Sequence, residues 1–583
     1  MNPTTPDLSL NAMDWSIVAA YFAVSLAIAL WYSRRASQGT EDFFLSGRGL
    51  PWWLAGTSMV ATTFAADTPL AVTELVAKHG IAGNWLWWSQ AFGTVLTVFF
   101  FAKLWRRAGV MTDVEFAELR YSGKPAACLR AFRAVYLALP VNLIIMGWVN
   151  LAMSTVLSVS LDMDRMTAVW FCFGITALYT VLSGFWGVVV TDLFQFVFAM
   201  TGCIILAAVA VNSLGGLHGM LDQVSLTSPL GAQTLSLFPS HDAAWMPWST
   251  FLVYVGMAWW ASWYPGAEPG GGGYVAQRIF AAKNERHAVG AALWFAIAHY
   301  ALRPWPWILV ALASVVMFPG LAKPGEGFPK VMMAVLPSPW KGFLIAAFAA
   351  AYMSTLSTHL NWGASYLVND VYRRFLRPDK DDRHYVWIAR LASLALAALS
   401  FLVTGWMDSV SEAWMFLIAV GAGCGAVYIL RLYWWRINAW SEISAMLGAP
   451  MIALSLPYIT GWSREDPGQY GWLMLLTTLG TTAVWLTVTL LTKPEPDAVL
   501  DSFYRKVAPA PEGWGAVARR VHPDSLAHAP LSLKRSALSW ALGCLCIYAS
   551  LFAIGQLLLG HALGAGLLAA AGAGALFLLL KTL

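Results

Sequence analysis

The sequence predicts an all-α polytopic membrane protein, and three observations lead to that fold class. Hydrophobic residues make up 58% of the 583 residues and charged residues only 11%, whereas soluble domains average about 25% charged residues. The mean hydropathy is +0.61. Apolar stretches near or above the roughly 20 residues of a spanning helix recur along the whole chain, at 14–33, 50–78, 82–106, 131–160, 165–184, 187–212, 246–276, 287–318, 340–372, 385–406, 411–431, 438–459, 470–491, 538–558 and 562–580. The last two are divided only by a short turn, so fourteen or fifteen spans are expected.

Basic residues predict the orientation of these spans. If the N-terminus lies outside, 28 Lys and Arg residues fall in the cytoplasmic loops and 6 in the outer loops, which is the bias that the positive-inside rule describes. The first stretch, 14–33, has no basic residue before it and is followed by Arg34 and Arg35. This order is the reverse of a cleavable signal peptide, so we expect an extra N-terminal helix that stays in the membrane. The net charge of +5 is explained by the loops and indicates no nucleic-acid partner.

The second stretch carries Asp67 about halfway along, followed by Thr68 and Pro69. A carboxylate at that depth costs about 2.5 to 3.5 kcal/mol unless it faces a cavity, an ion or a partner. Proline removes a backbone donor, so we expect the helix to break at Thr68 and Pro69. Broken helices with free carbonyls form the substrate and ion sites of secondary transporters. The stretch therefore indicates a transporter, with Asp67 and Thr68 as candidate substrate ligands.

A second break is predicted in the stretch 246–276. Two prolines and five glycines lie between Pro265 and Gly273, and a regular helix does not persist through such a composition. We expect this span to unwind around Glu268. The alternative is that the segment is a loop joining two elements, but the charge pattern needs a single crossing here.

The two breaks open two successive blocks of five spans, 50–212 and 246–431. Because each block has an odd number of crossings, the second must be inverted relative to the first, which is an architecture of secondary transporters. The remaining segments are expected to be peripheral helices, a cytoplasmic linker and C-terminal helices, at 438–491, 494–535 and 538–580.

Hydroxyl groups follow one face of the stretch 340–372. Ala351, Ser354, Thr355 and Thr358 are spaced i, i+3, i+4 and i+7, so they share a helix face. Hard cations prefer oxygen ligands of this kind. The alternative is close helix packing, with the hydroxyls bonded to carbonyls of their own helix.

Asp192 lies near the start of the stretch 187–212. It is either a functional carboxylate or a charge that stabilises the helix N-terminus at the membrane edge.

Several motifs together resemble those of the sodium:solute symporters. They occur in the family's order, cover roughly residues 14–435, and comprise 42–53 (DFFLSGRGLPWW), 191–195 (TDLFQ), 277–283 (QRIFAAK), 354–361 (STLSTHLN) and 369–372 (NDVY). The resemblance implies two inverted five-helix repeats like those of the bacterial leucine transporter. It also implies sodium-driven solute uptake by alternating access.

The resemblance implies particular ion ligands as well. The shared sodium site of the family would use the carbonyls of Ala61, Phe64 and Ala351 and the hydroxyls of Ser354 and Thr355. A second sodium site, present in some members, would use Asp192 with Ser354, Ser357 and Thr358.

The substrate residues differ from those of the galactose transporters in the family. Those transporters carry Glu-Gln near the first break and Asn plus Gln in the second, where this chain has Asp67-Thr68 and a glycine-rich insertion with Glu268. Arg303 lies near the place of their lysine. It either forms a structural ion pair with Asp67 or Glu268 or faces the cavity and binds a substrate carboxylate as a fork.

Tryptophans flank the predicted cavity, and their rings bind ammonium groups by cation–π attraction or stack on a ring. The candidates are Trp87, Trp88, Trp260 and Trp263, although most of the 32 tryptophans are expected to be interfacial anchors.

We therefore expect a sodium-coupled symporter of the bacterial inner membrane that imports a small polar organic solute, one that bears a carboxylate or an ammonium group. Sodium is the expected coupling ion, with no cofactor. The rivals are a sodium/sugar symporter, proton coupling through Asp67 or Asp192, and a non-transporting membrane sensor. An integral membrane enzyme is disfavoured because the sequence shows no catalytic or metal-binding constellation.

Overall fold

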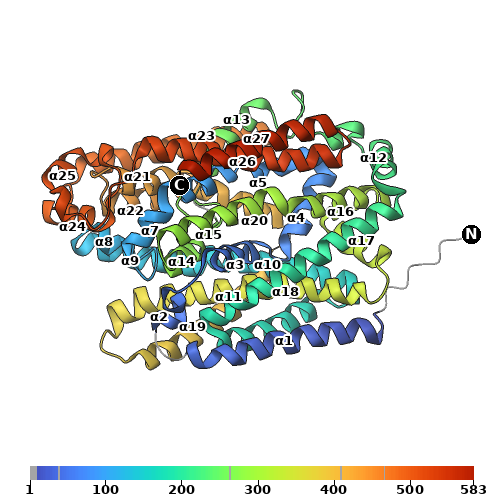
Figure 1. Cartoon of the computed structure of the whole chain (residues 1–583), viewed down its shortest axis with the longest axis horizontal. Coiled ribbons are helices and arrows are strands. Elements are labelled where there is room, and N and C mark those ends of the chain that lie inside the picture. The colour runs from blue at the N-terminus through green and yellow to red at the C-terminus, as the bar shows by residue number, and fades with distance from the viewer. Residues whose placement is uncertain (1–9, 37–39, 262–263, 408–409, 465, 583) are drawn as a thin grey trace, which may run out of the picture.

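Long helices that run in nearly the same direction make up most of the structure (Figure 1). The computed structural model describes residues 10–36, 40–261, 264–407, 410–464 and 466–582. Within these ranges no residue belongs to an extended strand. The all-α class predicted from the composition is therefore confirmed.

Ten of the described helical runs are long and apolar enough to cross a membrane, or eleven if one bent pair counts as a span. They agree with the apolar stretches of the sequence and are Ile81–Ala108, Gly123–Leu161, Gly187–Ser213, Glu285–Met317, Trp340–Leu376, Asp382–Thr404, Ala439–Thr460, Pro467–Leu491, Leu533–Leu558 and Ala562–Thr582. The bent pair, Ala413–Gly421 with Gly425–Tyr433, turns by 46°. The other predicted spans are the N-terminal helix, the two interrupted spans and the first part of α11, which are short, broken or only partly described.

The first block begins after the peripheral helix α1. Up to the end of this block the helices are α1 (Ala12–Ala36) and α2 (Thr40–Leu45), which precede it, and then α3 (Trp52–Thr63), α4 (Asp67–His79), α5 (Trp85–Trp88), α6 (Ala91–Leu96), α7 (Ala102–Ala108), α8 (Phe116–Arg120), α9 (Gly123–Tyr136), α10 (Asn142–Leu161) and α11 (Arg165–Ser213). The separate stretches 165–184 and 187–212 are joined in α11. The junction contains only glycines as helix-weakening residues, and each costs about 1 kcal/mol.

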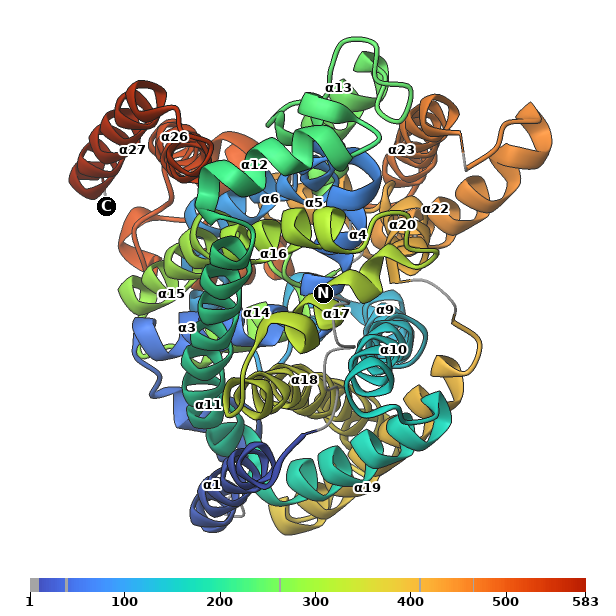
Figure 2. The same ribbon diagram turned by 90° about the vertical axis from the view of Figure 1, so that its right-hand side faces the viewer.

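The second block follows a connecting helix and is itself followed by peripheral helices. The elements are α12 (Gly216–Thr227), α13 (Trp248–Gly256), α14 (Gly273–Ala281), α15 (Glu285–Ile297), α16 (Pro304–Met317), α17 (Gly327–Val335), α18 (Trp340–Ser365), α19 (Asp382–Thr404), α20 (Val410–Gly421), α21 (Gly425–Tyr433), α22 (Ala439–Thr460), α23 (Pro467–Leu491), α24 (Asp497–Val507), α25 (Gly515–Arg520), α26 (Leu533–Leu558) and α27 (Ala562–Thr582). Viewed along the helices, α1, the α22–α23 pair and the α26–α27 pair lie at the periphery (Figure 2).

The two ends of the bundle carry different connections. One end, here called the α24 end, bears α2, α8, α24 and α25, and the opposite α12 end bears α12 and α17 (Figure 1). The basic loops predicted to be cytoplasmic therefore gather at the α24 end. This arrangement agrees with the predicted topology, in which the α12 end faces outward.

The first discontinuous span breaks between α3 and α4, at residues 64–66. This position differs from the predicted break at Thr68 and Pro69. Pro69 falls in the first turn of α4, where backbone N–H groups lack helical partners and proline costs nothing. The helix ends instead at Thr63, where the hydroxyl of that residue donates to the carbonyls of Met59 and Val60.

The second discontinuous span is broken as predicted. Helix α13 is followed by a short 3-10 turn at Ala258–Trp260, and regular helix resumes only with α14 at Gly273. Gly270, Gly271 and Gly273 have positive φ angles, which side chains other than glycine rarely adopt. Glycine therefore permits the return of the chain into α14.

Close backbone contacts fix the two discontinuous spans to their surroundings. The N–H of Leu50, before α3, donates to the carbonyl of Ala281 at the end of α14, and the N–H of Lys283 donates back to Leu50, both over 3.0 Å. Near the second break, a Cβ added at Gly425 would lie 1.5 Å from the carbonyl oxygen of Trp260. Only glycine allows α21 to approach the break this closely.

The segment 494–535, predicted as a cytoplasmic linker, is folded rather than extended. Phe503 of α24 and Trp514 are buried and their rings stack at 5.4 Å. Arg107 of α7 donates to the carbonyls of Val507, Ala508 and Ala529. Apolar residues at helical spacing within the segment therefore dock it against the α24 end.

Candidate functional site

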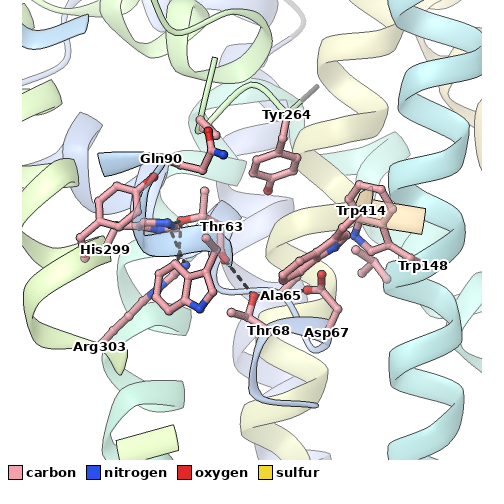
Figure 3. A pocket seen from close by; sticks show the side chains of 15 residues that line it. Thr63, Ala65, Asp67, Thr68, Gln90, Trp148, Tyr264, His299, Arg303 and Trp414 are labelled. Carbon is pink, nitrogen blue, oxygen red and sulfur yellow. Dashed lines mark hydrogen bonds between the residues drawn. The ribbon is translucent and has the colours of Figure 1, made fainter. Parts of the chain in front are cut away.

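A cavity of about 50 Å³ lies between the two discontinuous spans. It is lined by residues of α3, α4, α5, α10 and α20, of the turn between α15 and α16, and of the second break, among them Thr63, Asp67, Thr68, Trp87, Gln90, Trp148, Tyr264, His299, Arg303 and Trp414 (Figure 3). A water needs about 10–15 Å³ of such volume, so the cavity holds a few waters. A solute larger than that must widen it on binding.

Arg303 forms one wall of the cavity and is only 1% exposed. Its Nη1 donates to the carbonyl of Val60 over 3.2 Å and to the hydroxyl of Thr63 over 3.0 Å, which are groups at the end of α3. Its Nη2 lies 3.5 Å from Nε2 of His299, while Nε has no hydrogen-bond partner. Nε is buried, and the guanidinium carbon lies 5.0 Å from the centre of the Trp307 ring.

The opposite wall carries Asp67 and aromatic rings (Figure 3). Asp67 lies in the first turn of α4, where the helix dipole stabilises a negative charge. Thr68 donates to the carbonyl of Thr63 over 3.3 Å and lies 3.4 Å from Oδ1 of Asp67. The rings of Trp148 and Trp414 meet edge to face at 6.4 Å.

The predicted substrate residues divide into two groups. Asp67, Thr68, Trp87 and Arg303 line the cavity. Trp88, Trp260 and Glu268 do not line it, and Trp263 lies outside the described residues.

The residues that do not line the cavity have other neighbours. Trp88 packs against Phe552 at 6.0 Å. The carboxylate of Glu268 folds back toward Gly272, because a Cβ added at Gly272 would lie 2.8 Å from Oε2 of Glu268. The same carboxylate is close enough to Arg133 for an electrostatic interaction.

One of the two interpretations of Arg303 was a structural ion pair with Asp67 or Glu268. No ion pair within 4.0 Å joins Arg303 to Asp67 or Glu268 among the described residues. Arg303 is held instead by neutral acceptors at the end of α3.

The sequence analysis missed His299, Trp148, Tyr264 and Trp414 as cavity residues. A signal was available for His299, which stands four residues before Arg303 and therefore on the same helix face. The aromatic residues gave no signal, because tryptophans occur throughout the chain.

A larger cavity of about 500 Å³ lies next to this one, toward the α12 end. Its lining includes Leu70 and Ala71, one turn along α4 from Asp67, and Leu151, one turn along α10 from Trp148. The charged residues Glu74, Lys78, Arg165, Lys323 and Glu326 also line it. These positions place the two cavities about one helical turn apart along α4 and α10.

Charged side chains bind helices together near the α24 end. Glu442 of α22 accepts hydrogen bonds from Arg133 at 2.8 Å, from Tyr121 at 2.6 Å and from Arg431 at 3.4 Å. All four side chains are buried. Separating these helices would leave a buried carboxylate without partners, which costs free energy. The contacts therefore hold α9, α21 and α22 together near the α24 end.

The hydroxyl face of α18 lies against the end of α3. The hydroxyl of Thr355 donates to the carbonyl of Thr62 over 2.8 Å and to that of Ala351 in its own helix over 3.1 Å. Phe64, with ψ of 66°, ends the helical hydrogen bonding of α3. The predicted ligands Ala61, Phe64, Ala351 and Thr355 thus come from two segments that touch.

Asp192 of α11 is fully buried and lies beside the same face. It accepts hydrogen bonds from Ser354 at 2.6 Å and from Ser58 at 2.5 Å. Ser357, by contrast, donates to the carbonyl of Ser354 in its own helix. Thr358 lies 3.2 Å from the hydroxyl of Thr62.

Comparison with known proteins identifies the family. Residues 43–449 match the sodium:solute symporter family over more than half of the chain. The chain belongs to this family. As a symporter of the family it couples solute movement to sodium, and the resemblance seen in its motifs is confirmed.

Curated relatives cover most of the symporter. It is 26% identical over 475 residues to a sodium/glucose cotransporter of Vibrio parahaemolyticus, with 77% of this chain and 86% of that protein covered. It is 25% identical over 485 residues to a sodium/mannose cotransporter of Bos taurus, with 74% and 77% covered.

A solved structure of a sodium-coupled sialic acid symporter in a substrate-bound, outward-open state matches the symporter with a TM-score of 0.69. The two are 18% identical, and the match covers 84% of this chain and 99% of that one. At this identity the likeness shows the fold alone. It confirms the predicted leucine-transporter-type fold.

Proposed function

We propose that this symporter imports a small polar organic solute together with sodium, by alternating access between the two ends of the bundle. A cell that is negative inside by ~100 mV supplies about 2.3 kcal/mol for each sodium ion that enters. With the α24 end in the cytoplasm of a bacterial inner membrane, the cavity is reached from outside through the larger cavity at the α12 end.

The proposed sodium site consists of the carbonyls of Ala61, Phe64 and Ala351 and the hydroxyls of Ser354 and Thr355. The observation that carries this assignment is the 2.8 Å contact between Thr355 of α18 and the carbonyl of Thr62 in the last turn of α3. It brings a hydroxyl-rich face against a helix end, where carbonyls lack helical donors. Oxygen ligands of this type suit hard cations. The second site, predicted at Asp192, Ser354, Ser357 and Thr358, remains a prediction.

For the solute we propose a carboxylate, with an ammonium group at a second position. The Nε and Nη2 edge of Arg303 has the fork geometry that binds a carboxylate with two hydrogen bonds, and Nε has no hydrogen-bond partner among the described residues. Asp67 and the rings of Trp148 and Trp414 offer a negative charge and aromatic faces to an ammonium group. Unpaired charges are costly in a buried cavity, so a solute that matches both charges gains from each.

A neutral sugar is the second candidate. The relatives named above are described as glucose and mannose cotransporters, and aromatic rings such as those of Trp87 and Tyr264 line the cavity. This candidate leaves the charges of Arg303 and Asp67 without a function in binding. Proton coupling through Asp67 is the alternative to sodium.

A thermal-unfolding screen of the purified symporter tests the proposal. Amino acids, simple carboxylates, amines and hexoses are added with sodium and with choline in its place, because a ligand that binds the folded state stabilises it. We expect stabilisation by a carboxylated solute that is larger with sodium. Stabilisation by hexoses alone would reject the proposed solute and leave the sodium coupling standing, whereas equal stabilisation in sodium and choline would reject the coupling.

A further inference from the structure

The position predicted for a second sodium ion is occupied by an arginine of the protein. Arg278 of α14 and Asp192 of α11 are both 0% exposed, and Nη2 lies 3.3 Å from Oδ2. Nη2 also donates to the hydroxyl of Thr358 over 2.9 Å. Asp192 and Thr358 are two of the four predicted ligands of the second sodium ion.

Every nitrogen of this guanidinium has an acceptor. Nε donates to the hydroxyl of Ser58 over 2.9 Å, and Nη1 approaches the carbonyl of Tyr274 at 3.5 Å and the side-chain oxygen of Gln277 at 3.3 Å. The ring of Phe185 lies 5.0 Å from the guanidinium carbon. Arg278 therefore differs from Arg303, whose Nε has no hydrogen-bond partner among the described residues.

Both carboxylate oxygens of Asp192 likewise have hydrogen-bond partners. One oxygen of Asp192 accepts from Ser354, and the other accepts from Ser58 and Arg278. One negative and one positive charge thus balance within a cluster that excludes solvent. A sodium ion added to this cluster would leave a net positive charge in a buried place, which is costly.

The two cations also compete for the same atoms. A sodium ion bound to Asp192 Oδ2 and the Thr358 hydroxyl would need the two oxygens to which Nη2 of Arg278 donates. Ser357, the remaining predicted ligand besides Ser354, donates to a carbonyl of its own helix. Sodium and Arg278 therefore exclude each other at this position.

We propose that Arg278 is the resident cation of this site, so that the symporter binds a single sodium ion, at the site that contains Ser354 and Thr355. This inference rests on the proposed sodium coupling. Asp192 then acts as a positioning residue. Because Ser354 donates its proton to Asp192, the lone pairs of its hydroxyl oxygen are left for the sodium ion.

The Arg278–Asp192 pair also lies where four helices meet. Arg278 follows the second break and Ser58 precedes the first, while Asp192 and Thr358 belong to the continuous helices α11 and α18. The cluster therefore ties both discontinuous spans to these two helices. A sodium ion that replaced Arg278 would release α14 from them.

Binding of ²²Na⁺ to the purified full-length protein, with no solute present, tests the proposal. We expect one sodium ion bound per chain in the wild type. Arg278→Gln frees Asp192 and should raise the number to two. The double variant Asp192→Asn/Arg278→Gln removes both charges and should return it to one, with thermal stability closer to wild type than either single variant.

The matched control is Arg120→Gln. Arg120 is equally buried, but it donates to the carbonyls of Arg431, Trp434 and Trp435 and pairs with no carboxylate within 4.0 Å among the described residues. This variant should still bind one sodium ion.

Two bound sodium ions in the wild type, falling to one in Asp192→Asn with Arg278 intact, would overturn the proposal and make Asp192 a sodium ligand. The double variant keeps this comparison possible if a single variant does not fold. No bound sodium in the wild type would instead reject the sodium coupling on which the inference rests.

Discussion

Replacing Thr355 by valine gives the sharpest test of the proposed sodium site. The two side chains have nearly the same shape, so the change removes one oxygen and leaves the packing. In the structure this oxygen joins α18 to the last turn of α3 over 2.8 Å and is fully buried. The carbonyl of Thr62 then loses its partner, at a cost to folding of about 1–3 kcal/mol.

The expected effect of Thr355→Val on the affinity for sodium follows from the number of oxygen ligands that remain. The site loses one of its proposed oxygens, and an interaction with a charged group contributes about 1.5–3 kcal/mol. Since 1.4 kcal/mol corresponds to a factor of ten in an equilibrium constant, the half-saturating sodium concentration should rise about 10- to 100-fold. It is measured as sodium-dependent solute uptake into proteoliposomes, at saturating solute.

The control is Thr477→Val on α23. Thr477 is also a buried threonine, but its hydroxyl donates to the carbonyl of Leu473 in its own helix, far along the chain from the two breaks. Uptake by this variant should keep the wild-type sodium dependence. An unchanged half-saturation for sodium in Thr355→Val, with the protein folded, would refute the assignment.

Three further predictions address the solute, the buried charges around Glu442 near the α24 end, and the topology. Arg303→Lys keeps the charge but loses the fork, so the affinity for a carboxylated solute, measured by thermal shift, should fall at least 10-fold while neutral solutes are unaffected; equal losses for both would make Arg303 structural. Glu442→Gln leaves the buried Arg431 without its carboxylate and Arg133 with only Asp113, at 3.7 Å, so it should destabilise the protein by about 3–5 kcal/mol, whereas Glu512→Gln, at an exposed position, should cost under about 1 kcal/mol; similar unfolding temperatures would contradict this. In a background without native cysteines, a cysteine at Lys323 should react with an impermeant maleimide from outside intact cells and one at Lys506 should not; the opposite pattern would reverse the topology.

Composition and helix-breaking residues predicted an all-α membrane protein with two broken spans, and the resemblance of its motifs to the sodium:solute symporters implied the leucine-transporter-type fold. The second break follows from glycines and prolines within Pro265 to Gly273, because no regular helix tolerates them. The first break was predicted at residues 68–69 and lies at residues 64–66, two to five residues earlier. A proline breaks a helix in its interior and not in its first turn, and the sequence does not say where α4 begins.

Side-chain partners in the candidate site were harder to predict, because they come from distant parts of the chain. Arg278 and Asp192 are 86 residues apart, and they meet because α14 and α11 both pack against α3 and α18. The hydroxyl stripe on α18 could be found from its spacing, since a helix fixes which of its own residues share a face. Nothing local indicated that Glu268 would turn away from Arg303.

Uptake of ²²Na⁺ into proteoliposomes tests the central claim most directly. The symporter is reconstituted with an inside-negative potential, and sodium entry is measured with and without the solute that stabilises the protein in the thermal screen. The account predicts that solute accelerates ²²Na⁺ entry and that solute accumulates only when sodium is present outside. Accumulation driven by a proton gradient in sodium-free medium, with no solute-dependent entry of ²²Na⁺, would contradict it.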